Sequence, residues 1–168
     1  MNDSANNKHA MVSEAIAKKF ETEKAYLETL LAPWRYGPIE HVGSTAVIGL
    51  CAKPVIDVMV GVSSLIESEP AKHALMEAGY QYSDYMTHIM HWFCKPSFAM
   101  RTHHLHLVPY QSPLWQARLK FRDVLRTDSA VAAEYAALKM DLAKKFEFDR
   151  EVYTQAKAPF IERVLAAG

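Results

Sequence analysis

A single carboxylate lies inside an apolar run of this chain and limits how that run can be buried. The run Val55–Val62 has the length and composition of a buried strand, and Asp57 interrupts it. A carboxylate at such a position is costly unless another group pairs with it. A divalent cation is one such partner, and a neighbouring lysine or a backbone amide is another.

A turn of small residues precedes this strand. Gly43, Ser44 and Thr45 follow the short strand expected over Ile39–Val42. Glycine carries no Cβ to block an approaching group, and backbone amides and a hydroxyl at such a turn can contact an anion. The turn and the strand after it are typical of a phosphate-and-metal site. We therefore expect Gly43, Ser44 and Thr45 to bind phosphate.

Composition limits the class of protein. With 168 residues, 50% of them hydrophobic, the chain predicts one globular domain over residues 1–168. Nineteen basic side chains balance nineteen acidic ones, so any polyanion site must be local, and nucleic acid is not an expected partner. Two cysteines and the polar segment Met1–His9 predict a cytoplasmic protein, and no apolar run approaches the ~18 residues of a membrane helix.

Strands and helices alternate over the first two thirds of the chain. Apolar residues recur at helical spacing between Ser13 and Leu31, and a second helix begins near Pro70 and ends at Gly79. The remaining elements expected here are a strand over 39–42, a helical turn within 46–52, a strand over 55–62, and a hairpin of 87–95 with 102–109.

The last third of the chain is expected to be helical. One helix covers 112–126, Asp128 or Ser129 caps a second, and Asp149 caps a third. Pro159 predicts a kink or a break in the third helix. Together with the strands, these helices indicate an α+β fold with a small mixed sheet.

Four segments carry a recognisable pattern in chain order: Glu40–Leu50, Lys53–Asp57, His104–Val108 and Phe121–Arg126. Together they resemble the GrpB family. That family is similar to the nucleotidyltransferase superfamily and is sometimes fused to dephospho-CoA kinase. The resemblance implies an α+β, nucleotidyltransferase-like fold with a small mixed sheet, an N-terminal helix and a C-terminal helical bundle.

The chain departs from the superfamily at the metal-binding positions. Nucleotidyltransferases carry two carboxylates two residues apart on one strand, and often a third on a neighbouring strand, to hold two Mg²⁺ ions. Asp57 fits the first of these positions, and Met59 occupies the second. A thioether is a poor ligand for Mg²⁺. This departure argues against standard two-metal nucleotidyl transfer.

Histidines offer a different set of donors. On the expected strand, His104 and His106 project from one face and His103 from the other. Two imidazoles and Asp57 would suit Mn²⁺, Fe²⁺ or Zn²⁺ better than Mg²⁺. We therefore predict Asp57, His104 and His106 as catalytic residues and as ligands of a divalent metal ion (Mn, Zn or Mg), converging on one pocket beside Ser44. In the alternative reading, one histidine is structural and the others lie at the surface.

Basic side chains can complete a phosphate site. Lys53 lies just before the strand of Asp57, and Arg122 and Arg126 lie one helical turn apart, where they could form a fork for phosphate. We expect Lys53 and Arg122 to bind phosphate. Lys139 and Lys157, on later helices, are weaker candidates.

Two classes of function stay open. The first is a metal-dependent, nucleotidyltransferase-like transferase that acts on a nucleotide or another phosphate-bearing small molecule. The second is a non-catalytic module that binds a nucleotide or phosphate ligand on a degenerate nucleotidyltransferase fold. The histidine pair favours the first class, and Met59 favours the second.

Overall fold

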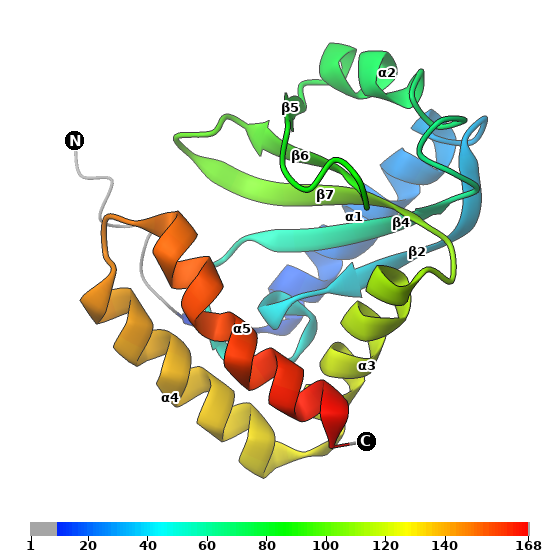
Figure 1. Cartoon of the computed structure of the whole chain (residues 1–168). Coiled ribbons are helices and arrows are strands. Elements are labelled where there is room, and N and C mark those ends of the chain that lie inside the picture. Colours follow the sequence, from blue (N-terminus) through cyan, green and yellow to red (C-terminus); the bar gives the residue numbers. More distant parts are fainter. Residues whose placement is uncertain (1–9, 168) are drawn as a thin grey trace.

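A mixed five-stranded sheet with helices on both faces forms the protein in the computed structural model, which describes residues 10–167 (Figure 1). The expected α+β class is confirmed. Residues 1–9, whose polar character was one reason to expect a cytoplasmic protein, lie outside the described residues. The elements are β1 (Ala10–Met11), α1 (Glu14–Leu30), β2 (Arg35–Val42), η1 (Ser44–Ala46), β3 (Cys51–Ala52), β4 (Ile56–Val62), α2 (Ala71–Glu77), β5 (Gln81–Ser83), β6 (His91–Pro96), β7 (Arg101–Pro109), α3 (Pro113–Thr127), α4 (Ser129–Lys145) and α5 (Arg150–Ala166).

The sheet has the order β2-β4-β7-β6-β5. Strands β4 and β7 run parallel, and the other neighbouring pairs are antiparallel. The parallel register sets Asp57 beside His104 and Met59 beside His106. Because side chains alternate along a strand, these four residues lie on one face of the sheet. Strands β1 and β3 form a separate pair.

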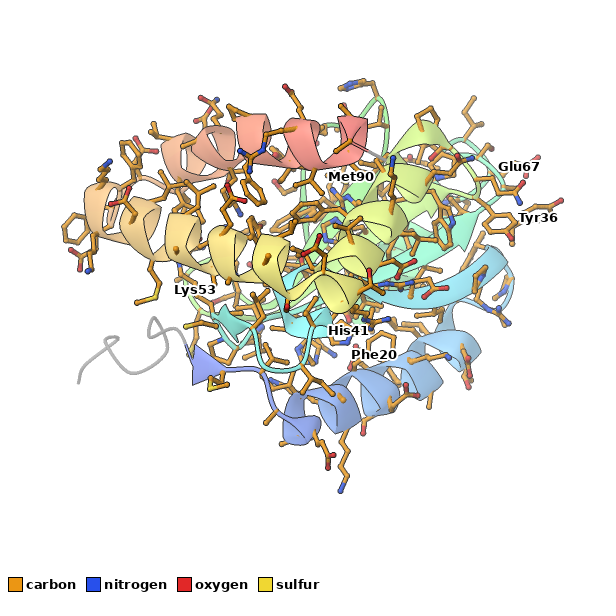
Figure 2. All side chains as sticks on the ribbon, turned by 90° about the horizontal axis from the view of Figure 1, so that it is seen from below. Phe20, Tyr36, His41, Lys53, Glu67 and Met90 are labelled. Carbon is orange, nitrogen blue, oxygen red and sulfur yellow. The ribbon has the colours of Figure 1, made fainter. Side chains whose placement is uncertain are left out.

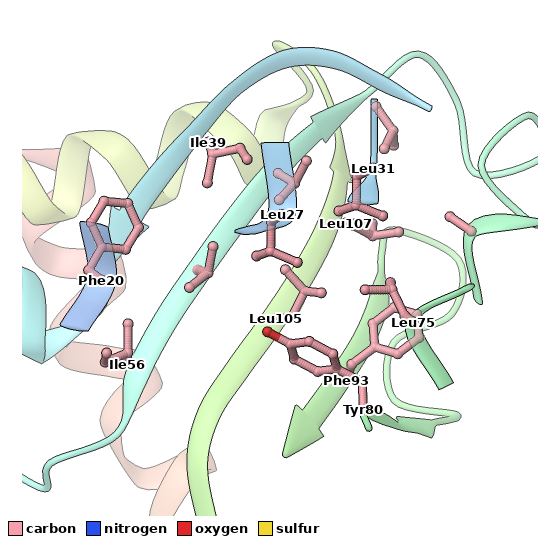
Figure 3. Close-up of a cluster of buried hydrophobic side chains, with 14 residues drawn as sticks. Phe20, Leu27, Leu31, Ile39, Ile56, Leu75, Tyr80, Phe93, Leu105 and Leu107 are labelled. Carbon is pink, nitrogen blue, oxygen red and sulfur yellow. The ribbon is translucent and has the colours of Figure 1, made fainter. Parts of the chain in front are cut away.

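The opposite face of the sheet holds the main apolar core. Helices α1 and α2 cover this face, and Figure 2 shows α1 on one side of the sheet and the C-terminal helices on the other. Phe20 of α1 stacks on His41 of β2, with ring centroids 4.5 Å apart. The buried members of this core, seen in Figure 3, are Phe20, Leu27, Leu31, Ile39, Ile56, Val58, Val60, Val62, Ala71, Leu75, Tyr80, Phe93, Leu105 and Leu107.

The C-terminal helices pack against the turn that follows β2. Val47 and Leu50 from this turn share a buried cluster with Leu125 of α3, Tyr135 of α4 and Phe160 of α5. The cluster fixes α4 and α5 over the Gly43–Leu50 segment, on the face of the sheet that carries Asp57. None of the helices described between residues 10 and 167 is long and apolar enough to cross a membrane.

The structure corrects several expected boundaries. The helical turn expected within 46–52 lies earlier, as the 3₁₀ turn η1 over Ser44–Ala46, and Cys51–Ala52 form strand β3. Strands β1 and β5 are also elements that the sequence pattern did not predict. Strand β2 begins at Arg35, because it lies at the edge of the sheet and an edge strand tolerates Pro38. Helix α5 continues through Pro159 without a break, since Phe160 and Val164 hold its second half in the core.

Candidate functional site

The carboxylate of Asp57 lies directly against the backbone of Gly43. A Cβ added to Gly43 would be 2.5 Å from Asp57 Oδ2 and 3.0 Å from its Cγ. Gly43 also has φ 73° and ψ −173°, a conformation that only glycine adopts readily. The glycine of the turn is therefore required both for the backbone path and for the close approach of Asp57.

Two imidazoles hold Asp57 from the neighbouring strand. Oδ1 of Asp57 accepts hydrogen bonds from His104 Nδ1 and from His106 Nε2, each at 3.1 Å. Burial opposes ionisation of the carboxyl group, but these two bonds outweigh it and hold the pKa of Asp57 well below its ordinary value. The Asp57 side chain remains 25% exposed, so the charged group can be reached from solvent.

Arg118 fixes the tautomer of His106. Its Nη1 donates to His106 Nδ1 at 2.6 Å, and a guanidinium group can only donate. The proton of His106 therefore sits on Nε2 and points at Asp57. Burial, followed by the charge of Arg118, lowers the pKa of His106 to about 4, so the imidazole is neutral at pH 7. The sequence reasoning missed Arg118, although it lies one helical turn before Arg122 on α3.

The donor set of these residues fits a divalent ion poorly. In His106 both ring nitrogens are engaged, and Oδ1 of Asp57 already accepts two N–H groups. Nε2 of His104, by contrast, has no partner among the described residues and is the one imidazole nitrogen of the pair left free to bind a ligand. No three His, Cys, Asp or Glu side chains of residues 10–167 are arranged to hold a metal ion. A metal centre at Asp57, His104 and His106 stays a prediction, and it would require Arg118 to release His106.

A buried lysine contacts the serine of the turn. Lys139 Nζ donates to Ser44 Oγ at 2.7 Å, and only 3% of Lys139 is exposed. Burial, followed by the charge of Lys157, lowers the pKa of Lys139 to about 8, while the charge of Asp57 acts in the opposite direction. Sequence reasoning ranked Lys139 below Arg122, because nothing local in the sequence shows which helix residue reaches the turn.

Lys157 and Lys53 lie close enough to Lys139 that their charges, after burial, help to lower its pKa. Burial lowers the pKa of Lys157, and the negative charge of Asp57 offsets part of that shift. Burial, then Arg150 and Arg101, lowers the pKa of Lys53. We call Lys53, Lys139 and Lys157 the lysine cluster.

Aromatic rings support the lysine cluster. Lys53 and Lys157 both lie over the ring of Tyr153, with Nζ at 5.3 Å and 4.7 Å from the ring centroid. Lys139 lies 5.0 Å from the centroid of Tyr135. A ring face attracts a cation, so these contacts offset part of the free-energy cost of removing the ammonium groups from water.

Thr45 has a structural role in the turn. Its Oγ1 donates to the carbonyl of Val55 at 3.1 Å and accepts from His41 Nε2 at 3.0 Å. Thr45 is 3% exposed. Both hydrogen-bonding functions of this hydroxyl are used within the fold, which does not support the phosphate-binding role predicted for it. Its neighbour Ser44 carries the hydroxyl that contacts the lysine cluster.

Arg122 joins α3 to β2 and does not pair with Arg126 in a fork. It contacts Glu40 Oε2 at 2.7 Å, Asp123 Oδ1 at 2.8 Å and the carbonyl of His41 at 3.2 Å. Arg126 donates to the carbonyl of Ala46 at 2.8 Å. The two guanidinium groups serve separate acceptors of the protein, so these contacts do not support the predicted phosphate site at Arg122.

Comparison with known proteins identifies relatives along nearly the whole chain. A family model described as "GrpB protein" matches residues 10–167. The Glutamate-rich protein GrpB of Alkalihalophilus pseudofirmus is 36% identical over 158 residues, which cover 91% of this chain and 90% of the relative. A UPF0157 protein of Deinococcus radiodurans is 39% identical over 127 residues, or 75% of this chain and 64% of the relative. The chain spans 44% of UPF0157 protein YqkA of Bacillus subtilis, at 30% identity.

Solved structures agree with the expected architecture. The crystal structure of the conserved protein GrpB from Enterococcus faecalis superposes with a TM-score of 0.83 and 28% identity over 95% of both chains. Cid1, solved in complex with its short product ApU, superposes with a TM-score of 0.52 and 11% identity, covering 83% of this chain and 44% of Cid1. At this low identity the similarity to Cid1 shows the fold alone, and that fold is nucleotidyltransferase-like.

Proposed function

The chain belongs to the GrpB family, and we propose that it binds a phosphate-bearing small molecule at the lysine cluster, with a nucleotide as the first candidate. The observation that carries this proposal is the bond between Lys139 Nζ and Ser44 Oγ, 2.7 Å long, in a chain whose net charge is zero. It joins a buried cation to the hydroxyl of the small-residue turn.

The charge of the site supports an anionic ligand. Buried ammonium groups lose hydration, and their lowered pKa values report that loss. A phosphate group placed among Lys53, Lys139 and Lys157 would restore favourable electrostatics and raise these pKa values. Charge-assisted hydrogen bonds from ammonium groups to phosphate are stronger than neutral ones.

The roles of the residues follow from this arrangement. Lys139 and the hydroxyl of Ser44 would contact a phosphate group directly, and Lys53 and Lys157 would neutralise further charge. Gly43 would allow the backbone of the turn to approach the ligand. The nucleotidyltransferase-like fold supports a nucleotide as the ligand that carries the phosphate.

A metal-dependent transferase is the second candidate function. The position of Asp57 beside Gly43 and Ser44, on a sheet of the nucleotidyltransferase type, favours it. Met59 at the second carboxylate position and the engaged nitrogens of His106 oppose it. Product formation from a nucleoside triphosphate that requires a divalent ion would establish this second function.

Thermal unfolding with a series of ligands tests the binding proposal. The series is ATP, ADP, AMP, inorganic triphosphate and adenosine, applied to the wild type, to Lys139→Met and to Lys145→Met. Lys145 is the matched control, because it lies on α4 but is 62% exposed and pairs with Asp141. We expect the phosphate compounds, and not adenosine, to raise the melting temperature of the wild type and of Lys145→Met.

Lys139→Met should lose this stabilisation. The proposal fails if no phosphate compound changes the melting temperature of the wild type. It also fails if Lys139→Met responds to the ligands as strongly as Lys145→Met does.

A further inference from the structure

We infer that the lysine cluster does the electrostatic work that divalent ions do in nucleotidyltransferases, so that the site takes its phosphate ligand free of metal. This inference rests on the proposed function, because it specifies the form of the ligand at the same site. Its consequence is that Mg²⁺ competes with the lysines for the ligand and does not assist its binding.

The balance of charge at the site favours this form. Of the carboxylates in the described part of the chain, Asp57 is the one whose charge acts on both Lys139 and Lys157. It also acts on Arg118, which lies beside His106. One carboxylate therefore acts on three cationic groups, and Lys53 adds its own positive charge beside Lys139 and Lys157. A divalent cation would add to an excess of positive charge, whereas a polyanion would reduce it.

The available donors lead to the same inference. Mg²⁺ prefers several hard oxygen ligands, and Met59 supplies none. The carboxylate opposite Met59 on β2 is Glu40, and it is bound by Arg122 at 2.7 Å. Asp57 Oδ1 accepts from two imidazoles, and Oδ2 lies against Gly43. Two of the oxygens that could bind a metal on this face of the sheet, Asp57 Oδ1 and Glu40 Oε2, thus already accept hydrogen bonds from protein groups.

The ligand itself distinguishes the two forms. Mg²⁺ neutralises part of the charge of a nucleoside triphosphate, so the metal complex offers less negative charge to the lysines than the free anion does. A site built for the metal complex gains affinity when Mg²⁺ is present. A site built from lysines loses affinity.

Isothermal titration of the full chain with ATP measures this difference. The dissociation constant is determined in EDTA and again in excess Mg²⁺, with inorganic triphosphate as a second titrant. We expect binding in EDTA, weakened about threefold to tenfold by Mg²⁺. Equal or tighter binding in Mg²⁺ would overturn the inference and leave the proposed function intact. Failure of ATP and triphosphate to bind under either condition would overturn both.

Asp57→Asn gives a test in which the two forms predict opposite signs. In a lysine site, loss of the carboxylate charge should tighten binding of metal-free ATP, by about threefold or more. In a metal site, the same change should abolish binding that depends on Mg²⁺. A melting curve shows whether the variant is folded. If it is unfolded, the titrations of the wild type in EDTA and in Mg²⁺ test the inference by themselves. Weaker binding of metal-free ATP to a folded Asp57→Asn variant would contradict the lysine site.

Discussion

The backbone of Gly43 and the carboxylate of Asp57 are in direct contact, because a Cβ at position 43 would lie 2.5 Å from Asp57 Oδ2. The contact joins the turn after β2 to the start of β4. It accounts for a glycine at this position, and it ties the conformation of the turn to that of the charged side chain.

Gly43→Ala should therefore destabilise the fold beyond the cost of its backbone conformation. Gly49 is the matched control, since its φ is +86° and a Cβ there would meet nothing within 4 Å. We expect Gly49→Ala to cost about 1–2 kcal/mol and Gly43→Ala at least about 1 kcal/mol more. Denaturant melts measure both. Equal losses would show that the contact with Asp57 relaxes without cost.

Lys139→Met should stabilise the ligand-free protein at pH 7. Burial lowers the pKa of Lys139 from 10.5 to about 8 in the folded state. Below pH 8 the charged ammonium group is therefore less stable in the folded protein than in the unfolded chain, and it destabilises the fold. Allowing for the lost bond to Ser44, we expect a gain of about 1–3 kcal/mol. The gain should shrink between pH 8 and pH 10.5, where the folded wild type releases the proton. A stability loss at pH 7 would mean that Lys139 is a favourable part of the core.

Asp57→Asn should destabilise the ligand-free protein. Folding lowers the pKa of Asp57 below its ordinary 3.8, so the charged carboxylate stabilises the fold above pH 4 and that contribution is lost as the pH falls further. The partners are His104 and His106, whereas the sequence analysis expected a neighbouring lysine or a backbone amide as the structural partner. We expect a loss of about 1–3 kcal/mol in denaturant melts in the presence of EDTA. An unchanged or higher stability would indicate that Asp57 is held mainly by a metal or ligand.

Stability should fall as the pH drops from 6.5 to about 4. Burial, the main cause in each case, lowers the pKa values of His41 and His106 from 6.5 to about 4. In this interval the unfolded chain binds a proton at each of these histidines and the folded chain does not. Each histidine therefore lowers the free energy of unfolding by about 1.4 kcal/mol per pH unit. Denaturant melts at pH 7 and pH 5 measure the slope. His41→Gln should reduce it, and an equal slope in that variant would contradict the assignment to His41.

Arg122→Met should affect stability and spare ligand binding. The Arg122 side chain is 11% exposed, pairs with Asp123 on the same helix and joins α3 to Glu40 of β2. Loss of these charge-assisted contacts should cost about 1–3 kcal/mol of stability. Because no contact of Arg122 involves the lysine cluster, the dissociation constant of ATP should stay within about twofold of the wild type. A loss of affinity of about tenfold in a folded variant would restore the phosphate-binding role predicted from sequence.

Local rules of the backbone account for what the sequence predicted well. Alternation along a strand set His104 and His106 on one face and His103 on the other, and the register of β4 and β7 agrees. Ser112, Asp128 and Asp149 each accept a hydrogen bond from the first turn of a C-terminal helix, as their residue types indicated.

Partners that are distant in sequence could not be predicted in this way. Lys139 reaches Ser44 only because of how α4 packs on the turn, and Arg118 reaches His106 because of how α3 packs on the sheet. Thr45 and Ser44 are adjacent and chemically alike, yet the 3₁₀ turn sends one hydroxyl to Val55 and the other to a lysine. These outcomes depend on packing angles that no residue pattern records.

The bond between Ser44 and Lys139 spans 95 positions of the chain, and this separation orders events during synthesis. Asp57 and the strands around it are synthesised before α4 and α5, since a chain is made from its N-terminus. The growing chain therefore carries Asp57 and Lys53 before Lys139 and Lys157 have been made. Closing so long a loop costs entropy that the packing of the last helices must first offset. An anion bound at the proposed site would thus connect α4 and α5 to a sheet that was synthesised before them.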